Sequence, residues 1–143
     1  MKRFVSMLCA AFLVCSLTIP AFAAEDDRAV IDLGGGFYMV EQISYQIGPR
    51  DENLVYSRKV GTAYYNNTQV GTATLAASFD ISGSTAEATS ASISGNGLNG
   101  GAYENGSTRC SGNKAIGTAT FSYGGVSRSL TLTLTCTPGG SVT

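Results

Sequence analysis

The sequence predicts an all-β protein, and three observations support that class. Apolar residues recur at every second position, as in Leu130, Leu132 and Leu134, which alternate with threonines. Turn-forming pairs such as Asn66-Asn67 and Gly124-Gly125 separate these segments. No segment has the pattern of a long amphipathic helix. We therefore expect an antiparallel, immunoglobulin-like sandwich of about seven strands, with a small closed barrel as the alternative.

Each expected strand is a run of alternating or β-branched residues between turn signals. Near the middle of the chain, Val60-Gly61-Thr62-Ala63 recurs as Val70-Gly71-Thr72-Ala73, on either side of Asn66-Asn67. This echo predicts the two arms of one hairpin. The strands are expected, in order, at 37–47, 54–65, 73–81, 85–93, 102–110, 115–123 and 130–136.

The N-terminus has the three-part layout of a secretory signal peptide. Lys2 and Arg3 precede 16 uncharged residues (4–19), and Ala21-Phe22-Ala23 supplies the small-x-small cleavage pattern. The apolar run is shorter than the ~20 residues that span a bilayer. We expect residues 1–23 to be removed, 24–36 to form a flexible acidic and glycine-rich segment, and 37–143 to form a single β-sandwich domain. The predicted location is outside the cell.

The charge balance limits the classes of partner that this chain is expected to bind. Lys2 and Arg3 leave with the signal peptide, so seven of the nine basic residues remain against ten acidic ones, a net charge of −3. A sparse, acidic set of charges argues against nucleic acid and against an anionic membrane surface. The expected partner is therefore an extracellular protein, a glycan or a second copy of the chain, without stable membrane insertion.

The residue inventory argues against catalysis. The chain has no histidine, which excludes Ser-His-Asp and Cys-His arrangements and imidazole ligation of zinc. Asp80 and Glu87 flank one turn, but no convergent cluster of titratable residues accompanies them. The spacing of a calcium loop is also missing. We predict a protein that is not an enzyme and has no catalytic, cofactor-binding or metal residues.

Cys110 and Cys136 predict one disulfide, because an exported domain with two cysteines commonly joins them. Cys136 is in phase with Leu130, Leu132 and Leu134, so its sulfur should face the core. The pair lacks the C-x-x-C spacing of redox-active sites, which favours a structural bond.

Two surfaces are candidates for recognition. The region 94–113 is rich in glycine and asparagine, and its larger side chains form a possible binding loop of Leu98, Tyr103, Glu104 and Arg109. The alternative is that these residues belong to simple hairpin connections. Exposed tyrosines could also stack on sugar rings, although adjacent Tyr64 and Tyr65 must face opposite sides of a strand. The tyrosines are Tyr38, Tyr45, Tyr56, Tyr64, Tyr65, Tyr103 and Tyr123.

The opening Met1-Lys2-Arg3, the junction Ala21-Phe22-Ala23-Ala24-Glu25-Asp26 and the Gly/Ser/Thr-rich strands resemble small exported bacterial proteins of uncharacterised families. The glycine-rich segment 32–38 fits the same layout. This resemblance implies a bacterial, Gram-positive origin and carries over no functional residue.

Two functional hypotheses follow. The leading one is a secreted, non-enzymatic β-sandwich module that binds a partner or glycan, or assembles, outside the cell. Self-association would use the regular strand 129–135, provided that it lies at a sheet edge. The alternative is a secreted toxin or bacteriocin-like effector, which small size and export also fit.

Overall fold

A computed structural model describes residues 28–47 and 53–143 of the chain and folds them into eight β-strands. No helix within these residues is long and apolar enough to cross a membrane. The strands are β1 (Ala29–Gly34), β2 (Phe37–Ile47), β3 (Leu54–Tyr65), β4 (Thr68–Asp80), β5 (Glu87–Gly97), β6 (Ala102–Ser111), β7 (Lys114–Tyr123) and β8 (Val126–Thr135).

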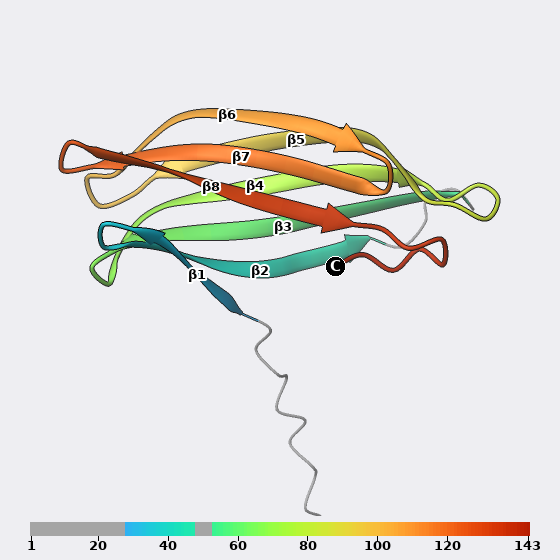
Figure 1. Cartoon of the computed structure of the whole chain (residues 1–143), viewed down its shortest axis with the longest axis horizontal. Helices are drawn as coiled ribbons and strands as arrows, with labels where there is room; N and C mark the ends of the chain where they lie inside the picture. The colour runs from blue at the N-terminus through green and yellow to red at the C-terminus, as the bar shows by residue number, and fades with distance from the viewer. Residues whose placement is uncertain (1–27, 48–52) are drawn as a thin grey trace, which may run out of the picture.

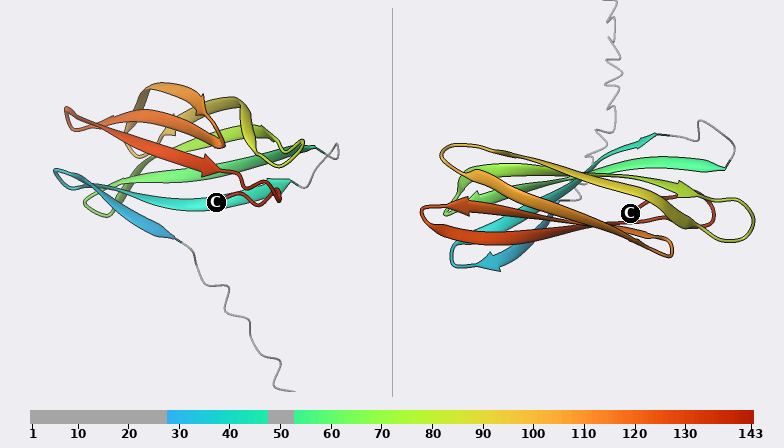
Figure 2. Two further views of the ribbon diagram at one scale, coloured as in Figure 1. Left: turned by 45° about the vertical axis from the view of Figure 1, so that its right-hand side comes forward. Right: turned by 90° about the horizontal axis from the view of Figure 1, so that it is seen from above.

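The strands form two antiparallel sheets that lie face to face (Figures 1 and 2). One sheet has the order β1-β2-β3-β4-β5 and the other the order β6-β7-β8. Four of the turns contain only two residues between strands, and Asn66, Asn67, Gly124 and Gly125 take the positive φ that such turns require. These short turns return each strand beside its predecessor, so spatial order follows chain order.

This connectivity corrects the predicted immunoglobulin-like arrangement. That fold needs Greek-key connections, in which a strand leaves its sequence neighbour to pair elsewhere. Here every ladder joins consecutive strands. The alternative of a closed barrel is also wrong, because β5 and β6 follow one another in the chain yet belong to different sheets. The prediction of antiparallel strands in a sandwich is confirmed.

Strand β1 is a second correction. We expected residues 24–36 to be a flexible segment, but Ala29–Gly34 pairs with β2, with Ile31 opposite Met39 and Val30 opposite Val40. The β-branched pair Val30-Ile31 favours a strand, and a glycine turn at 35–36 returns the chain into β2. The signal peptide, residues 24–27 and the predicted turn at 48–51 lie outside the described residues.

The core lies between the sheets and follows the alternation that the sequence predicts. On β8 the side chains of Leu130, Leu132 and Leu134 are buried, while Ser129 before them and Thr131 between them are exposed. Cys136 continues the buried row, which confirms its predicted direction. The β3–β4 hairpin also confirms the predicted pair of arms, with Gly61 opposite Ala73.

Close approach of the sheets depends on glycines beneath aromatic rings. A Cβ built on Gly71 of β4 would lie 2.3 Å from Cε1 of Phe121 on β7, far inside van der Waals contact. A Cβ on Gly95 of β5 would lie 2.2 Å from Cδ2 of Tyr103 on β6. Because these two glycines have no side chain, aromatic rings of the opposite sheet pack directly on their backbone.

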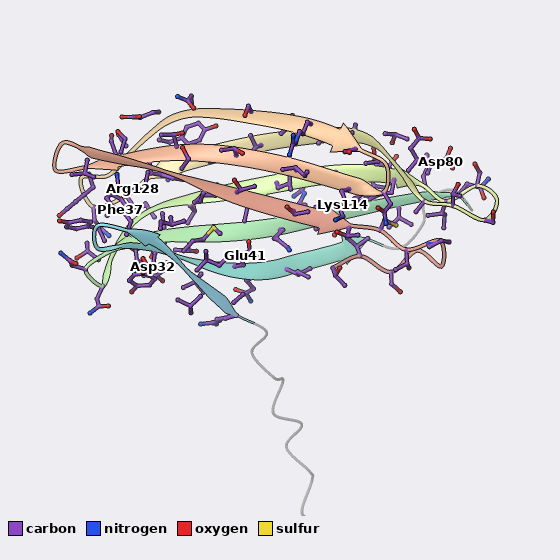
Figure 3. All side chains as sticks on the ribbon, viewed as in Figure 1. Asp32, Phe37, Glu41, Asp80, Lys114 and Arg128 are labelled. Atoms are coloured by element: carbon purple, nitrogen blue, oxygen red, sulfur yellow. The ribbon has the colours of Figure 1, made fainter. Side chains whose placement is uncertain are left out.

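Strand β8 lies at the edge of its sheet, as the self-association hypothesis requires. Part of that edge is covered by the C-terminal residues, because Thr135 and Thr143 exchange backbone hydrogen bonds of 2.8 and 3.0 Å. At the other end of β8, the side chain of Arg128 reaches the β1–β2 turn, after which Phe37 begins β2 (Figure 3 labels both residues). Its guanidinium is so close to Gly35 that an added Cβ there would lie 2.9 Å from Nη2. The C-terminal residues thus pair with one end of the β8 edge, and at the other end the side chain of Arg128 contacts the β1–β2 turn.

Candidate functional site

The four residues of the predicted binding loop do not form a loop. Leu98 lies in the turn after β5, where its amide donates a 2.9 Å hydrogen bond to the carbonyl of Val70. Tyr103, Glu104 and Arg109 all lie on β6. The region 94–113 is thus mostly strand, with two short turns.

Tyr103 is a packing residue in this structure. Its ring is half-buried between the sheets, over Gly95, and its centroid lies 5.6 Å from that of Phe121. Glu104 and Arg109 are exposed. The carboxylate of Glu104 accepts a 3.1 Å hydrogen bond from the hydroxyl of Ser127 on β8. Tyr103 thus packs against the core, whereas Glu104 and Arg109 face solvent.

Arg109 instead borders a depression of about 310 Å³ on the outer face of the three-stranded sheet. Hydroxyl groups dominate its lining, and Thr118 and Thr131 form one cross-strand pair with Oγ1 atoms 3.3 Å apart. No aromatic side chain lines it. The lining residues are Ser107, Thr108, Arg109, Ile116, Thr118 and Thr131.

The predicted disulfide is wrong, because Cys110 and Cys136 are both free thiols. Cys110 is opposite Ala115, and Ala115 is opposite Leu134, so β7 separates the two cysteine-bearing segments. Two strand spacings amount to about 9.5 Å, whereas bridged cysteines need Cα atoms within about 7 Å. Cys136 is buried, and Cys110 is exposed on an edge strand.

Burial raises the pKa of the Cys136 thiol above its ordinary value of 9.0. The thiol donates a weak hydrogen bond of 3.4 Å to the carbonyl of Thr137. It therefore remains protonated in the core.

The tyrosine side chains that the structure describes include inward-facing and outward-facing rings. Tyr65 packs inward, with its ring centroid 4.9 Å from that of Phe37 and 5.2 Å from that of Tyr123. Tyr64 faces outward and stacks on Tyr38 with centroids 5.0 Å apart and planes 4° from parallel. The opposite directions of Tyr64 and Tyr65 confirm that prediction.

The outer face of the five-stranded sheet carries the depression that we select as the candidate site. Its volume is about 270 Å³, and it extends across β3, β4 and β5. Two rows of paired residues cross it. One row joins Tyr56, Ser78 and Ser90, and the other joins Arg58, Ala76 and Ser92.

The depression arises from side-chain size. Ala76 and Ser78 on the central strand are small, whereas Tyr56 and Arg58 beside them on β3 are long. The central strand therefore forms a low floor, with β3 as the tall wall and the serines of β5 as the opposite rim. The backbone at Ser57 and Ala77, whose side chains face the core, completes the lining.

Hydroxyl groups organise the floor and rim. Ser78 shares hydrogen bonds with the hydroxyls of Ser90 and Thr89, the second at 2.9 Å. The hydroxyl of Thr89 also donates to the carbonyl of Ser78 at 3.2 Å. Ser78 is thereby fixed in place, and exposed Ser92 stands at the rim beside it.

Sequence reasoning missed this site except for Tyr56. Arg58, Ser78, Ser90 and Ser92 carry no motif and are 34 positions apart at most. Their alternation with buried residues predicts outward side chains. Their convergence depends on the register of three strands, and only the structure gives that register.

The carboxylate pair Asp80 and Glu87 is adjacent, as their positions around the turn predicted, since they are register partners on β4 and β5. Hydrogen bonds from the backbone amide and hydroxyl of Ser82 lower the pKa of Asp80 below 3.8, and the amide bond measures 2.7 Å. A general acid needs the opposite shift. Within residues 28–47 and 53–143, no three Cys, Asp or Glu side chains cluster as metal ligands would.

No family model, curated protein or solved structure matches this chain.

Proposed function

We propose that this chain is a secreted, non-enzymatic β-sandwich module that binds a glycan in the depression between Tyr56, Arg58 and Ser92. The observation that supports this proposal is the composition of the depression. It brings an aromatic ring, a guanidinium and several hydroxyls around a small apolar floor at Ala76. A sugar ring presents apolar C–H faces and a rim of hydroxyls, so it needs both kinds of contact.

The other depression supports this choice by contrast. The site around Arg109 offers hydroxyls and one guanidinium but no aromatic ring. It can hydrogen-bond to a sugar but cannot stack on one. Tyr56 therefore distinguishes the two surfaces and supports the choice of the five-stranded sheet for the proposed glycan.

Two features support binding without turnover. The described acidic residues nearest the depression along β4 and β5 are Asp80 and Glu87, and neither lines it. Asp80 has a lowered pKa, so it holds no proton to donate at neutral pH. The secreted location comes from the N-terminal pattern of the sequence alone.

A glycan array with the folded chain tests the proposal. We expect binding to a defined set of glycans, weakened at least about fivefold by Tyr56→Ala, because loss of an aromatic contact should cost about 1 kcal/mol or more. Ala76→Leu should abolish binding by filling the floor without changing the core. Thr131→Ala, in the other depression, is the matched control and should bind normally.

The proposal fails if no glycan binds, or if Tyr56→Ala and Ala76→Leu bind as well as the unmodified chain. Chemical turnover of a bound glycan would contradict the non-enzymatic part. Growth inhibition of bacterial strains by the chain would favour the toxin hypothesis instead.

A further inference from the structure

The depression contains one unpartnered cation, and that cation specifies the ligand further. Arg58 is the charged residue among those lining the site. Its side chain is exposed, and the structure gives it no ion pair within residues 28–47 and 53–143. Lys59, its neighbour in sequence, is paired with Glu41 on the opposite face of the sheet. The guanidinium of Arg58 is therefore available to pair with a charged ligand.

The geometry of the row places this charge at one side of the floor. Arg58, Ala76 and Ser92 lie side by side on three strands. Two strand spacings put the backbones of Arg58 and Ser92 about 9.5 Å apart, with the small side chain of Ala76 between them. A group bound over Ala76 would meet the guanidinium from one side and the Ser92 hydroxyl from the other.

The local charge favours an anion at this point. Arginine presents a planar fork of N–H donors that matches a carboxylate or sulfate, and serine adds a hydroxyl donor. Asp80 is the nearest described acid along β4, and its Oδ1 accepts the Ser82 amide at the turn. No described carboxylate lines the depression to oppose a bound anion.

We propose that the depression binds an acidic sugar, with the carboxylate or sulfate of the sugar held by Arg58 and its ring stacked on Tyr56. This inference rests on the proposed glycan-binding function and narrows it to one chemical class. The single arginine that lines the depression suits an isolated acidic group, and a densely charged polyanion would require clustered basic residues.

Matched monosaccharides test the charge without changing the ring. The methyl glycosides of glucose, glucuronic acid and glucose 6-sulfate, and their galactose counterparts, differ in the substituent at carbon 6. Each is titrated into the isotopically labelled chain, and the backbone amide signals of residues 56–58, 76–78 and 90–92 are followed by NMR. Comparing the uronates with the sulfated sugars also shows whether the site prefers a carboxylate or a sulfate.

We expect at least one acidic sugar to bind about tenfold more tightly than its neutral counterpart, as one charge-assisted hydrogen-bonded contact provides. Arg58→Gln should remove that preference, so that the ratio of acidic to neutral affinity falls from about ten to about one. Arg58→Lys keeps the charge without the fork and should retain part of the preference. Arg109→Gln is the matched control in the second depression and should keep the full preference.

The outcomes separate the two proposals. Equal affinity for neutral and acidic sugars at these residues would overturn the acidic-sugar inference and leave glycan binding intact. An acidic preference that survives in Arg58→Gln would also overturn it. If none of the six sugars shifts signals of the depression while the glycan array still shows binding that Tyr56→Ala weakens, the inference fails and the proposed function stands. If the array shows no binding either, both fail. Thermal unfolding of each variant confirms that an exposed substitution has not changed the fold.

Discussion

The Nζ atom of Lys59 lies 3.6 Å from the Oε2 atom of Glu41, and the pair faces the space between the two sheets. The register establishes that direction. Glu41 is opposite Gly61, over which Leu132 of β8 packs, and Lys59 is opposite buried Leu75. The side chains of Lys59 and Glu41 keep only 11% and 18% of their exposure. An ion pair thus continues the inner face of the larger sheet (Figure 3 labels Glu41).

Removing one partner of this pair should be costly. Lys59→Met leaves the Glu41 carboxylate without its cation, and we expect a loss of about 3 kcal/mol in the free energy of unfolding. The double variant Lys59→Met/Glu41→Leu should recover most of that loss, because apolar side chains can fill the same space. Chemical denaturation of the four members of this cycle measures the coupling. Lys114→Met, at an exposed site, should change stability by less than about 0.5 kcal/mol. A double variant as unstable as the sum of the single changes would contradict this account.

Gly71→Ala tests the close approach of the sheets. Its Cβ would meet the ring of Phe121, so either the ring or the strands must move, which should cost about 1 to 3 kcal/mol. Gly139→Ala is the matched control, because its nearest neighbour outside the flanking residues would be Thr137 Oγ1 at 3.9 Å. Urea denaturation compares the two, with an unchanged slope expected in both. Similar midpoints for the two variants would show that the sheets are not limited by this contact.

The two thiols should react at very different rates. Cys110 is exposed, whereas Cys136 is buried and its pKa is raised. A maleimide is added to the folded chain without residues 1–23, which contain Cys9 and Cys15. It should label Cys110 rapidly and Cys136 only in denaturant, as counted by mass spectrometry. Cys110→Ser should remove the fast reaction entirely. A chain that carries no reactive thiol and is lighter by two hydrogens would restore the disulfide.

Cys136 also predicts a loss of stability at high pH. Its pKa is higher in the folded chain than in the unfolded chain, so the unfolded state releases its proton first as pH rises. Stability should therefore fall once pH passes about 9, the ordinary value for the thiol. Denaturation midpoints of the unmodified chain and Cys136→Ala should converge as pH is raised, if the loss of packing in the variant is constant. A difference independent of pH would contradict the assignment.

Asp80 should affect the stability of the fold at acidic pH. Its pKa is lowered by the hydrogen bonds from Ser82, so its stabilising effect is present above about pH 3.8 and is lost as pH falls through the lowered pKa. Asp80→Asn should be less stable than the unmodified chain at neutral pH and equal to it in strong acid. Thermal unfolding across this range measures the difference. Glu87→Gln, at the neighbouring position on β5, is the matched control.

The fold was predictable where local pattern decides it. The alternating pattern of β8 correctly predicted its buried face, including Cys136. The paired asparagines correctly predicted the β3–β4 hairpin. The sheet connectivity was not predictable in this way, because the same alternating strands satisfy Greek-key and sequential orders equally well. Strand β1 was hidden by Asp32 and the glycines after it, which resemble a flexible hinge when the partner strand is unknown.

The candidate site was predictable only in part. By sequence, both Tyr56 and Tyr103 are among the tyrosines that could stack on sugars. Tyr56 lines the candidate site, whereas the ring of Tyr103 packs on Gly95 between the sheets. The local sequence does not distinguish these two tyrosines, because each stands in a strand between one apolar and one polar neighbour. The register across β3, β4 and β5 decides that Arg58 and Ser92 flank one small alanine. Long-range pairing of this kind is absent from a single strand's sequence.

The sequential order of the strands has a consequence for how the chain acquires its structure during synthesis. Every strand after β1 finds its ladder partner, or in the case of β6 its hairpin neighbour β5, immediately upstream. Once residue Gly97 has emerged, the larger sheet contains all of its strands and needs only a cover. The remaining three strands can then pack on this sheet one after another. No strand of the emerging chain therefore has to remain unpaired until a partner distant in sequence has been made.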